Sequence, residues 1–437
     1  MEDLVQPVSL VRVAERLRSG DTEPLAEAER TLRRIAEADG TVRAFVPEPD
    51  RAGRLRAAAR ELAARGTAPG DRPALYGVPV GVKDIVHVDG LPTAAGSALP
   101  PEELAGPQAA VVDRLVGAGA LIAGKTATGE FAVTAPAPTR NPHHPDHTPG
   151  GTSSGTAAAV AAGMVPLAIG TQTIGSLIRP AAYCGVVGFK PSHGRIPLDG
   201  VLPVAPTFDT VGVAAATVAD ATLAAEVLCD GFDPSKAPAG RPVLGVPEGP
   251  YLDFAEPGAR AAYDRQLAAL AAAGYEIVRV PLFEKLEEEA FPLFVINLYE
   301  LSRAHADRFG RFGELYDERT AQAIVQGQGA SEEDHRACLE QREHFRGAIA
   351  EAARAHGVDL WAAPAATGPA PGDLGNPGES VMSLPWSGAG LPCLTLPQAR
   401  TEGELPLGFQ LVGHPGGDEA LLAWAAELER PVSADAT

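Results

Sequence analysis

The sequence predicts an α/β protein in which helices cover both faces of a central, largely parallel β-sheet. Helical patterns alternate with short β-branched runs along most of the chain, and this alternation is typical of layered α/β folds. The 48 glycines and 40 prolines are spread through the 437 residues without marking a linker. One large domain is therefore expected over residues 1–437.

The expected elements follow in chain order. Residues 8–65 are rich in Arg and Glu and have the pattern of amphipathic helices that end near glycine. Residues 70–229 carry most of the helix–strand alternation and are expected to form the catalytic core, which residues 361–430 complete. Residues 230–360 are expected to form a variable helical covering region, because long charged helical patterns dominate its second half.

Composition excludes several classes of partner and site. With 36 Lys and Arg against 56 Asp and Glu, the net charge of −20 disfavours direct binding of nucleic acid or of an anionic membrane. The N-terminus lacks the apolar run of a secretory signal, and a cytoplasmic location is expected. Neither a zinc ribbon nor a disulfide framework is indicated, because the four cysteines are widely spaced: Cys184, Cys229, Cys338 and Cys393.

One long segment without charge is the first place to look for chemistry. No charged residue occurs from Thr148 to Ile178, although a run of 31 positions at 21% charged residues would hold about six or seven. Glycines, Pro166 and several hydroxyl residues interrupt the apolar run that a membrane span needs. The segment is therefore expected to be buried within the protein, where each hydroxyl requires a hydrogen-bond partner.

Three motifs suggest other sites, and the residues around them argue against each. Residues 119–126 fit a phosphate-binding loop, but a helix precedes them and their centre is apolar, so a strand ending near Lys125 is expected. Residues 151–155 fit a nucleophile elbow, but the proline-rich stretch before them cannot be a central strand. Solvated loop side chains are favoured over a metal site for the cluster of His143, His144, Asp146 and His147.

Lys83 is a candidate general base. The chain has 31 Arg and only five Lys, so a lysine within an apolar β-branched run suggests a role that Arg cannot fill, namely the loss of a proton. Burial would lower the pKa of Lys83 and supply a neutral amine. An ion pair with the neighbouring Asp84 is an equally open interpretation.

Two Gly/Ser-rich segments offer a nucleophile and donors for an oxyanion. Ser176 ends a glycine-containing turn in which the backbone N–H groups of Thr173, Ile174, Gly175 and Ser176 could point at one position. Residues 150–155 form a hydroxyl-rich loop that could relay protons between a buried lysine and this serine. Taken singly, either segment could also be ordinary turn chemistry.

Several motifs together resemble the amidase signature family. They are GVPVGVKD at 77–84, PGGTSSG at 149–155, GTQTIGSLIRP at 170–180, CGVVGFKP at 184–191 and LPLGFQLVG at 405–413. The resemblance covers most of the chain and is weakest over 230–360. It implies a single α/β/α domain with a mixed sheet, no metal or organic cofactor, and a Ser–Ser–Lys mechanism on a small-molecule amide.

The resemblance also implies a role for individual residues. Lys83 matches the base, Ser176 the nucleophile and Thr152 the relay hydroxyl, which the family places 24 positions before the nucleophile on a cis peptide. Ser153 is expected as a neighbouring hydroxyl in contact with substrate. Arg179 is similar to an arginine of the malonamidase-like branch that binds a substrate carboxylate, although a structural ion pair remains an open alternative.

The chain departs from the family pattern at three positions, and these keep other functions open. Thr152 replaces a serine, Ile174 replaces a small residue and Ser154 replaces a common glycine. Hydrolysis of a small carboxamide is the expected activity. The alternatives are transfer of the acyl group to an amine or alcohol, including cyclisation, and an inactive amidase-like binding protein. A glutamine-hydrolysing component of a tRNA amidotransferase is possible by kinship, and a homodimer is an open expectation.

Overall fold

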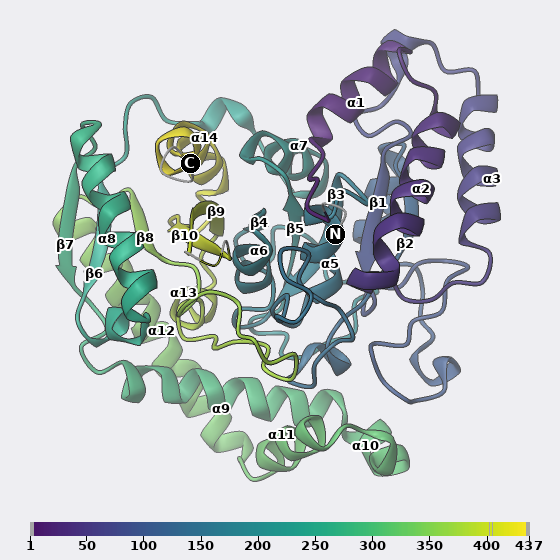
Figure 1. The fold of residues 1–437 in the computed structure, drawn as a ribbon. Helices are drawn as coiled ribbons and strands as arrows, with labels where there is room; N and C mark the ends of the chain where they lie inside the picture. Colours follow the sequence, from purple (N-terminus) through teal and green to yellow (C-terminus); the bar gives the residue numbers. More distant parts are fainter. Residues whose placement is uncertain (1–3, 402, 404, 434–437) are drawn as a thin grey trace.

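The computed structural model describes residues 4–401, 403 and 405–433. Within these ranges, ten strands form one sheet that helices surround (Figure 1). The strands are β1 (Pro79–Lys83), β2 (Leu121–Thr126), β3 (Leu167–Gln172), β4 (Val187–Lys190), β5 (Thr210–Ala215), β6 (Leu244–Glu248), β7 (Ile277–Pro281), β8 (Leu360–Pro364), β9 (Cys393–Arg400) and β10 (Pro406–Val412).

The helices fall into an N-terminal group, a group that packs on the sheet and a covering group. The first group is α1 (Leu10–Ser19), α2 (Pro24–Val42) and α3 (Arg51–Ala64). The second is α4 (Ala110–Gly117), α5 (Ser154–Ala161), α6 (Ile178–Cys184), α7 (Val218–Leu228), α8 (Pro257–Ala272), α13 (Leu384–Gly388) and α14 (Asp418–Ser433). The third is α9 (Leu286–Ala304), α10 (Ala306–Phe312), α11 (Glu318–Gln328) and α12 (Glu332–His356).

The strand directions confirm a mixed sheet and correct one expectation. The strands lie in the order β2-β1-β3-β5-β4-β9-β10-β8-β6-β7. Parallel pairs occur only at the two ends, and the five pairs from β3 to β8 are antiparallel. The prediction of a largely parallel sheet is therefore wrong. It treated each strand as part of a βαβ crossover, whereas β4 and β5, and β9 and β10, follow one another without an intervening α-helix in the described ranges.

The covering segment 230–360 also extends the sheet. Its first half supplies β6, α8 and β7, and these two strands form the sheet edge farthest from β2. Only the second half, α9 to α12, is a helical cover, which lies along the lower side of the molecule in Figure 1. The helix α12 begins where Ser331 and Asp334 cap one another and ends at Gly357, whose φ of 64° suits a residue without a side chain.

The uncharged segment lies at the centre of the core, as expected. Every residue from 148 to 178 is buried except Ile174, which is half-buried. Its strand β3 lies between β1 and β5, and the helices α5 and α6 flank it in sequence. The Thr156 hydroxyl donates to the Ile169 carbonyl at 3.1 Å, so even a deep hydroxyl has a partner. None of the helices in the described ranges combines the length and apolar character needed to cross a bilayer.

Candidate active site

Lys83 ends β1 with its amine fully buried among hydroxyl groups. Its Nζ lies 2.9 Å from Thr152 Oγ1, 3.0 Å from Ser153 Oγ and 2.8 Å from Thr171 Oγ1. Burial lowers the pKa of Lys83 to about 7, against a smaller opposing effect of the Asp209 charge. The expectation of a shielded amine with a low pKa is met, and such an amine is partly unprotonated at neutral pH.

The alternative partner of Lys83, Asp84, faces elsewhere. Successive residues of an extended chain point to opposite sides, so Asp84 turns away from the hydroxyl cluster. Its Oδ1 forms a buried ion pair of 2.8 Å with Lys125, and its Oδ2 accepts hydrogen bonds from the N–H groups of Ala94 and Ala95. Lys125 lies in β2, which confirms that residues 119–126 are not a phosphate-binding loop but end as a strand.

The hydroxyls of Thr152 and Ser153, two of the three beside Lys83, differ in their hydrogen bonds. The Gly151–Thr152 peptide is cis, as the resemblance implied. Ser153 Oγ donates a hydrogen bond to the Thr171 carbonyl at 2.9 Å, so toward Lys83 it acts as a hydrogen-bond acceptor. Thr152 Oγ1 has Lys83 as its partner, and its own proton is not directed to a carbonyl in the described structure. Thr171 Oγ1 likewise has Lys83 as its partner and donates to no carbonyl among the described residues, so Thr152 and Thr171 are the hydroxyls that can exchange a proton with the amine. Of these two, Thr152 is the one that the motif assigns to the relay.

Ser153 is completely buried and does not line the cavity beside Ser176, and its contact with substrate stays a prediction. Its N–H donates to the Ser176 carbonyl at 2.9 Å, which fixes the two loops side by side. Within the described residues, no hydrogen bond joins the Thr152 and Ser176 hydroxyls, so the proton transfer between them stays a prediction.

The turn that carries Ser176 presents free backbone donors. In the described part of the chain, the N–H groups of residues 173–176 donate to no protein acceptor. Most buried amides are paired, so four consecutive unpaired ones mark a place prepared for a ligand atom. Gln172 holds the end of the turn, because its Oε1 accepts from the N–H groups of Leu177 and Ile178 at 2.9 Å each.

A cavity of about 350 Å³ opens beside this turn. One wall includes Ser176, Arg179 and Glu379, and the facing wall from α9 and α11 combines apolar side chains with Asn297 and Arg319. Ile174 lines the same cavity and packs against the apolar cluster that includes Phe208 and Leu293. The residues that line the cavity are Ala132, Val133, Thr134, Thr173, Ile174, Ser176, Arg179, Val204, Phe294, Asn297, Leu298, Leu301, Arg319, Ala323, Asn376, Pro377, Gly378, Glu379 and Ser380.

Arg179 is a buried cation without a carboxylate partner in the described structure. Its Nη2 donates to the Gly151 carbonyl at 2.5 Å, and its buried Nε has no hydrogen-bond acceptor. Burial lowers the pKa of Arg179, and the charge of Glu379 opposes this without forming an ion pair with it. The structural ion pair considered for Arg179 is therefore absent among these residues.

The sequence did not indicate three further candidates for a functional role. Thr171 completes the set of hydroxyls around Lys83, Gln172 holds the Ser176 turn, and the buried Asp209 accepts the hydroxyl proton of Thr173 at 2.7 Å. Thr171 and Gln172 lie in a quoted motif and could have been found from it. Asp209 carried no signal, because 33 positions of sequence separate it from Ser176 and only the β3–β5 pairing brings it near.

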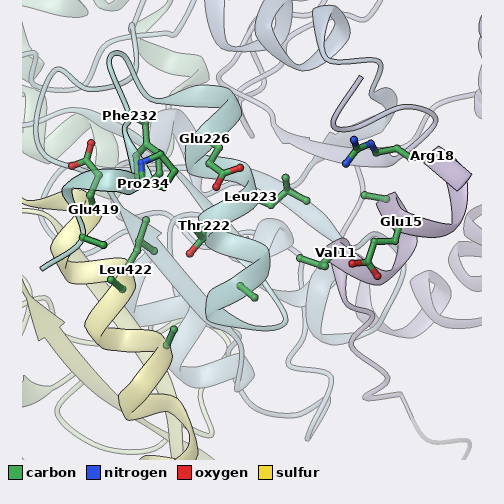
Figure 2. A pocket seen from close by; sticks show the side chains of 15 residues that line it. Val11, Glu15, Arg18, Thr222, Leu223, Glu226, Phe232, Pro234, Glu419 and Leu422 are labelled. Atoms are coloured by element: carbon green, nitrogen blue, oxygen red, sulfur yellow. The ribbon is translucent and has the colours of Figure 1, made fainter. Parts of the chain in front are cut away.

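Other features singled out in the sequence lie apart from this site. His143 and His147 lie against the carbonyls of Cys184 and Ala370, and no three metal-ligating side chains gather in the described ranges. A second cavity of about 450 Å³ lies among α1, α7 and α14 (Figure 2). Its lining is largely apolar, with Glu15 and Glu226 among the labelled side chains, and it includes none of the predicted site residues.

Comparison with known proteins defines the class of protein as a hydrolase that acts on carbon–nitrogen bonds. A model of the Amidase family matches residues 27–422, and the chain belongs to this family. It is 32% identical to a component of the Glutamyl-tRNA(Gln) amidotransferase of Chloroflexus aurantiacus over 463 aligned positions, covering 93% of each chain.

Solved structures agree with this assignment. One described as an amidase is 33% identical, with a TM-score of 0.88 over 97% of this chain and all of that chain. The peptide amidase of Stenotrophomonas maltophilia is 27% identical, with a TM-score of 0.81 over 97% of each chain. These likenesses confirm the fold and the family but not the malonamidase-like branch.

Proposed function

We propose that this protein hydrolyses a small carboxamide that also carries a carboxylate, through an acyl-enzyme on Ser176. The observation that carries the proposal is the buried Lys83 amine, which has a pKa of about 7 and lies 2.9 Å from Thr152 Oγ1. An amine with this pKa can act as a base at neutral pH. A serine hydroxyl is a weak nucleophile at its own pKa and needs such a base.

The first step forms the acyl-enzyme. Lys83 accepts the proton of Thr152 while Thr152 accepts the proton of Ser176. Ser176 Oγ then bonds to the amide carbon, and the carbonyl electron pair moves onto the oxygen. The unpaired N–H groups of residues 173–176 donate to this oxyanion in the proposed mechanism.

The second step releases both products. The carbon–nitrogen bond breaks as the proton held on Lys83 returns through Thr152 to the leaving nitrogen. Water then attacks the acyl-enzyme and its proton passes to Lys83. The bond to Ser176 Oγ breaks as that proton returns through Thr152 to Ser176, which releases the carboxylic acid and restores the neutral amine. Thr152 keeps the hydroxyl that this relay needs, and its extra methyl group restricts the side chain to fewer rotamers.

Arg179 supports a substrate with a carboxylate. A buried guanidinium without an acidic partner is costly, and a substrate carboxylate in the cavity would supply the missing negative charge. The Nη1 group of Arg179 and the second N–H of its Nη2 remain for a bidentate contact with this carboxylate. On this basis we propose that the protein falls in the malonamidase-like branch.

Matched amides test the proposal. Succinamate and butyramide have the same four-carbon amide skeleton, and only succinamate ends in a carboxylate. We expect ammonia release with kcat/KM at least about tenfold higher for succinamate. Arg179→Lys should reduce this preference, and Ser176→Ala should abolish both activities. Equal kcat/KM values for the two amides would contradict the carboxylate contact, and activity that survives in Ser176→Ala would contradict the mechanism.

A second candidate function is glutamine hydrolysis within a larger assembly, favoured by similarity to a component of an amidotransferase. Glutamine carries both a primary carboxamide and a carboxylate, the two groups that the cavity is proposed to bind. Faster ammonia release from glutamine than from succinamate would favour this function. Under either function, the absence of direct nucleic-acid contact, the cytoplasmic location and the homodimer remain predictions.

Two further experiments separate hydrolysis from the remaining alternatives. If the acyl-enzyme passes its acyl group to added hydroxylamine or other amines far more readily than to water, the protein is an acyltransferase. A fluorophosphonate probe that labels no serine between about pH 6 and 10 would favour a binding protein without catalysis. Labelling that disappears in Ser176→Ala would support catalysis.

A further inference from the structure

Asp209 is a buried carboxylate that accepts three hydrogen bonds. It directly precedes β5, whose first residue, Thr210, pairs with Gln172 at the end of β3. This register places Asp209 beside Thr173. Its Oδ1 accepts from Thr173 Oγ1 at 2.7 Å, and its Oδ2 accepts from the N–H groups of Val204 and Ala205 at 2.8 and 3.0 Å.

The contacts of Asp209 are those that an ionised carboxylate accepts. All three partners donate to the carboxylate, and no acceptor in the described residues receives a proton from it. Burial, together with the charge of Glu300, raises the pKa of Asp209, and the three donors act in the opposite direction. No cation in the described structure forms an ion pair with it. In its ionised form, Asp209 favours the ammonium form of Lys83.

The Thr173 contact holds the start of the turn that carries Ser176. The opposite end of this turn is held by Gln172, through the N–H groups of Leu177 and Ile178. The free N–H groups of residues 173–176 lie between these two anchors. The positions of these N–H groups relative to one another therefore depend on the Thr173–Asp209 contact as well as on Gln172.

The charge of Asp209 acts on Lys83 through space. During the proposed mechanism, Lys83 becomes an ammonium ion in a fully buried site. The Asp209 charge favours this state, and it opposes the effect of burial on the pKa of Lys83. Other charged or titratable groups lie near residues 206–209. Glu300 and Arg342 contact Thr207, His193 contacts the Pro206 carbonyl, and His335 contacts Glu300.

We propose that Asp209 is a positioning residue that holds the Ser176 turn through Thr173 and stabilises the protonated form of Lys83. This inference rests on the proposed Ser176 chemistry. One carboxylate then both fixes the positions of the oxyanion donors and stabilises the charged form of the base. The proposal predicts that loss of the charge and loss of the hydroxyl contact have different effects.

Labelling of Ser176 by a fluorophosphonate, measured against pH, separates the two effects. Asp209→Asn removes the charge and disturbs the turn, so we expect the second-order labelling rate to fall at least about tenfold. The midpoint of its rise with pH should also move to lower pH, because the Lys83 ammonium loses a favourable charge. Thr173→Val keeps the charge and should slow labelling without moving the midpoint.

Two controls make the result decisive. Thr210→Val removes a neighbouring buried hydroxyl that bonds to the Phe208 carbonyl, and it should change neither rate nor midpoint. Thr173→Ser keeps the contact and should restore the rate lost in Thr173→Val. If Asp209→Asn fails to fold, equal rates for the two Thr173 variants overturn the inference. If Asp209→Asn folds, an unchanged midpoint overturns it. A wild-type protein that is not labelled at all instead refutes the proposed function.

Discussion

Replacing Lys83 by Met should change how the stability of the protein depends on pH. The amine is fully buried with a pKa of about 7 in the folded protein, against an ordinary value of 10.5. Between these values the unfolded chain binds a proton that the folded protein does not. The free energy of unfolding of the wild type therefore rises with pH in this window, relative to a variant without the amine.

The structure sets the size of this effect. Each unit of pKa difference corresponds to about 1.4 kcal/mol, so the buried amine costs the folded state about 5 kcal/mol below pH 7. Between pH 7 and pH 9, this penalty falls by about 2 kcal/mol. The hydrogen bonds that Met cannot make to Thr152, Ser153 and Thr171 are also lost, but this loss is nearly independent of pH in that range.

Urea unfolding of both proteins at pH 7, 8 and 9 measures the effect. The stability of Lys83→Met relative to the wild type should decrease by about 2 kcal/mol from pH 7 to pH 9. Lys285→Met removes an exposed lysine and is the matched control. A difference between Lys83→Met and the wild type that stays constant with pH would refute the reasoning, since it would mean that Lys83 folds with its proton.

Two other substitutions test the groups around Lys83. Thr152→Val keeps the shape of the side chain but removes the relay hydroxyl, so the rate of succinamate hydrolysis should fall about 10²- to 10⁴-fold. Thr152→Ser keeps the hydroxyl, and its rate should stay within about tenfold of the wild type. Equal activity of the two variants would exclude Thr152 as the relay. Lys125→Met leaves the buried Asp84 without its ion-pair partner and should lower the free energy of unfolding by about 3–5 kcal/mol in urea. Adding Asp84→Asn to Lys125→Met should restore part of that stability, and a double variant no more stable than Lys125→Met would contradict the pairing.

Local sequence patterns predicted the elements of the fold better than their arrangement. The buried uncharged segment and the strand around Lys125 follow from composition and apolar runs, which depend on neighbouring residues. Strand direction depends on which distant segments pair. The antiparallel centre of the sheet could therefore not be predicted from the alternation of helices and strands.

The site divides in the same way. Lys83, Thr152 and Ser176 could be named because each lies in a distinctive motif. The partner of Asp84 was not apparent, because Lys125 lies on another strand and only the β1–β2 pairing brings the two side chains together. Asp209 and the cavity wall from α9 and α11 are contributed by distant segments without a recognisable motif.

The most direct test of the account is the titration of the Lys83 amine itself. The chain has five lysines, so selective isotope labelling of lysine side chains gives an NMR spectrum of five signals. One signal should titrate with a midpoint near pH 7 and be missing in Lys83→Met. If the signal that this substitution removes keeps its ammonium shift up to about pH 10, Lys83 is not a neutral base and the proposed mechanism is wrong.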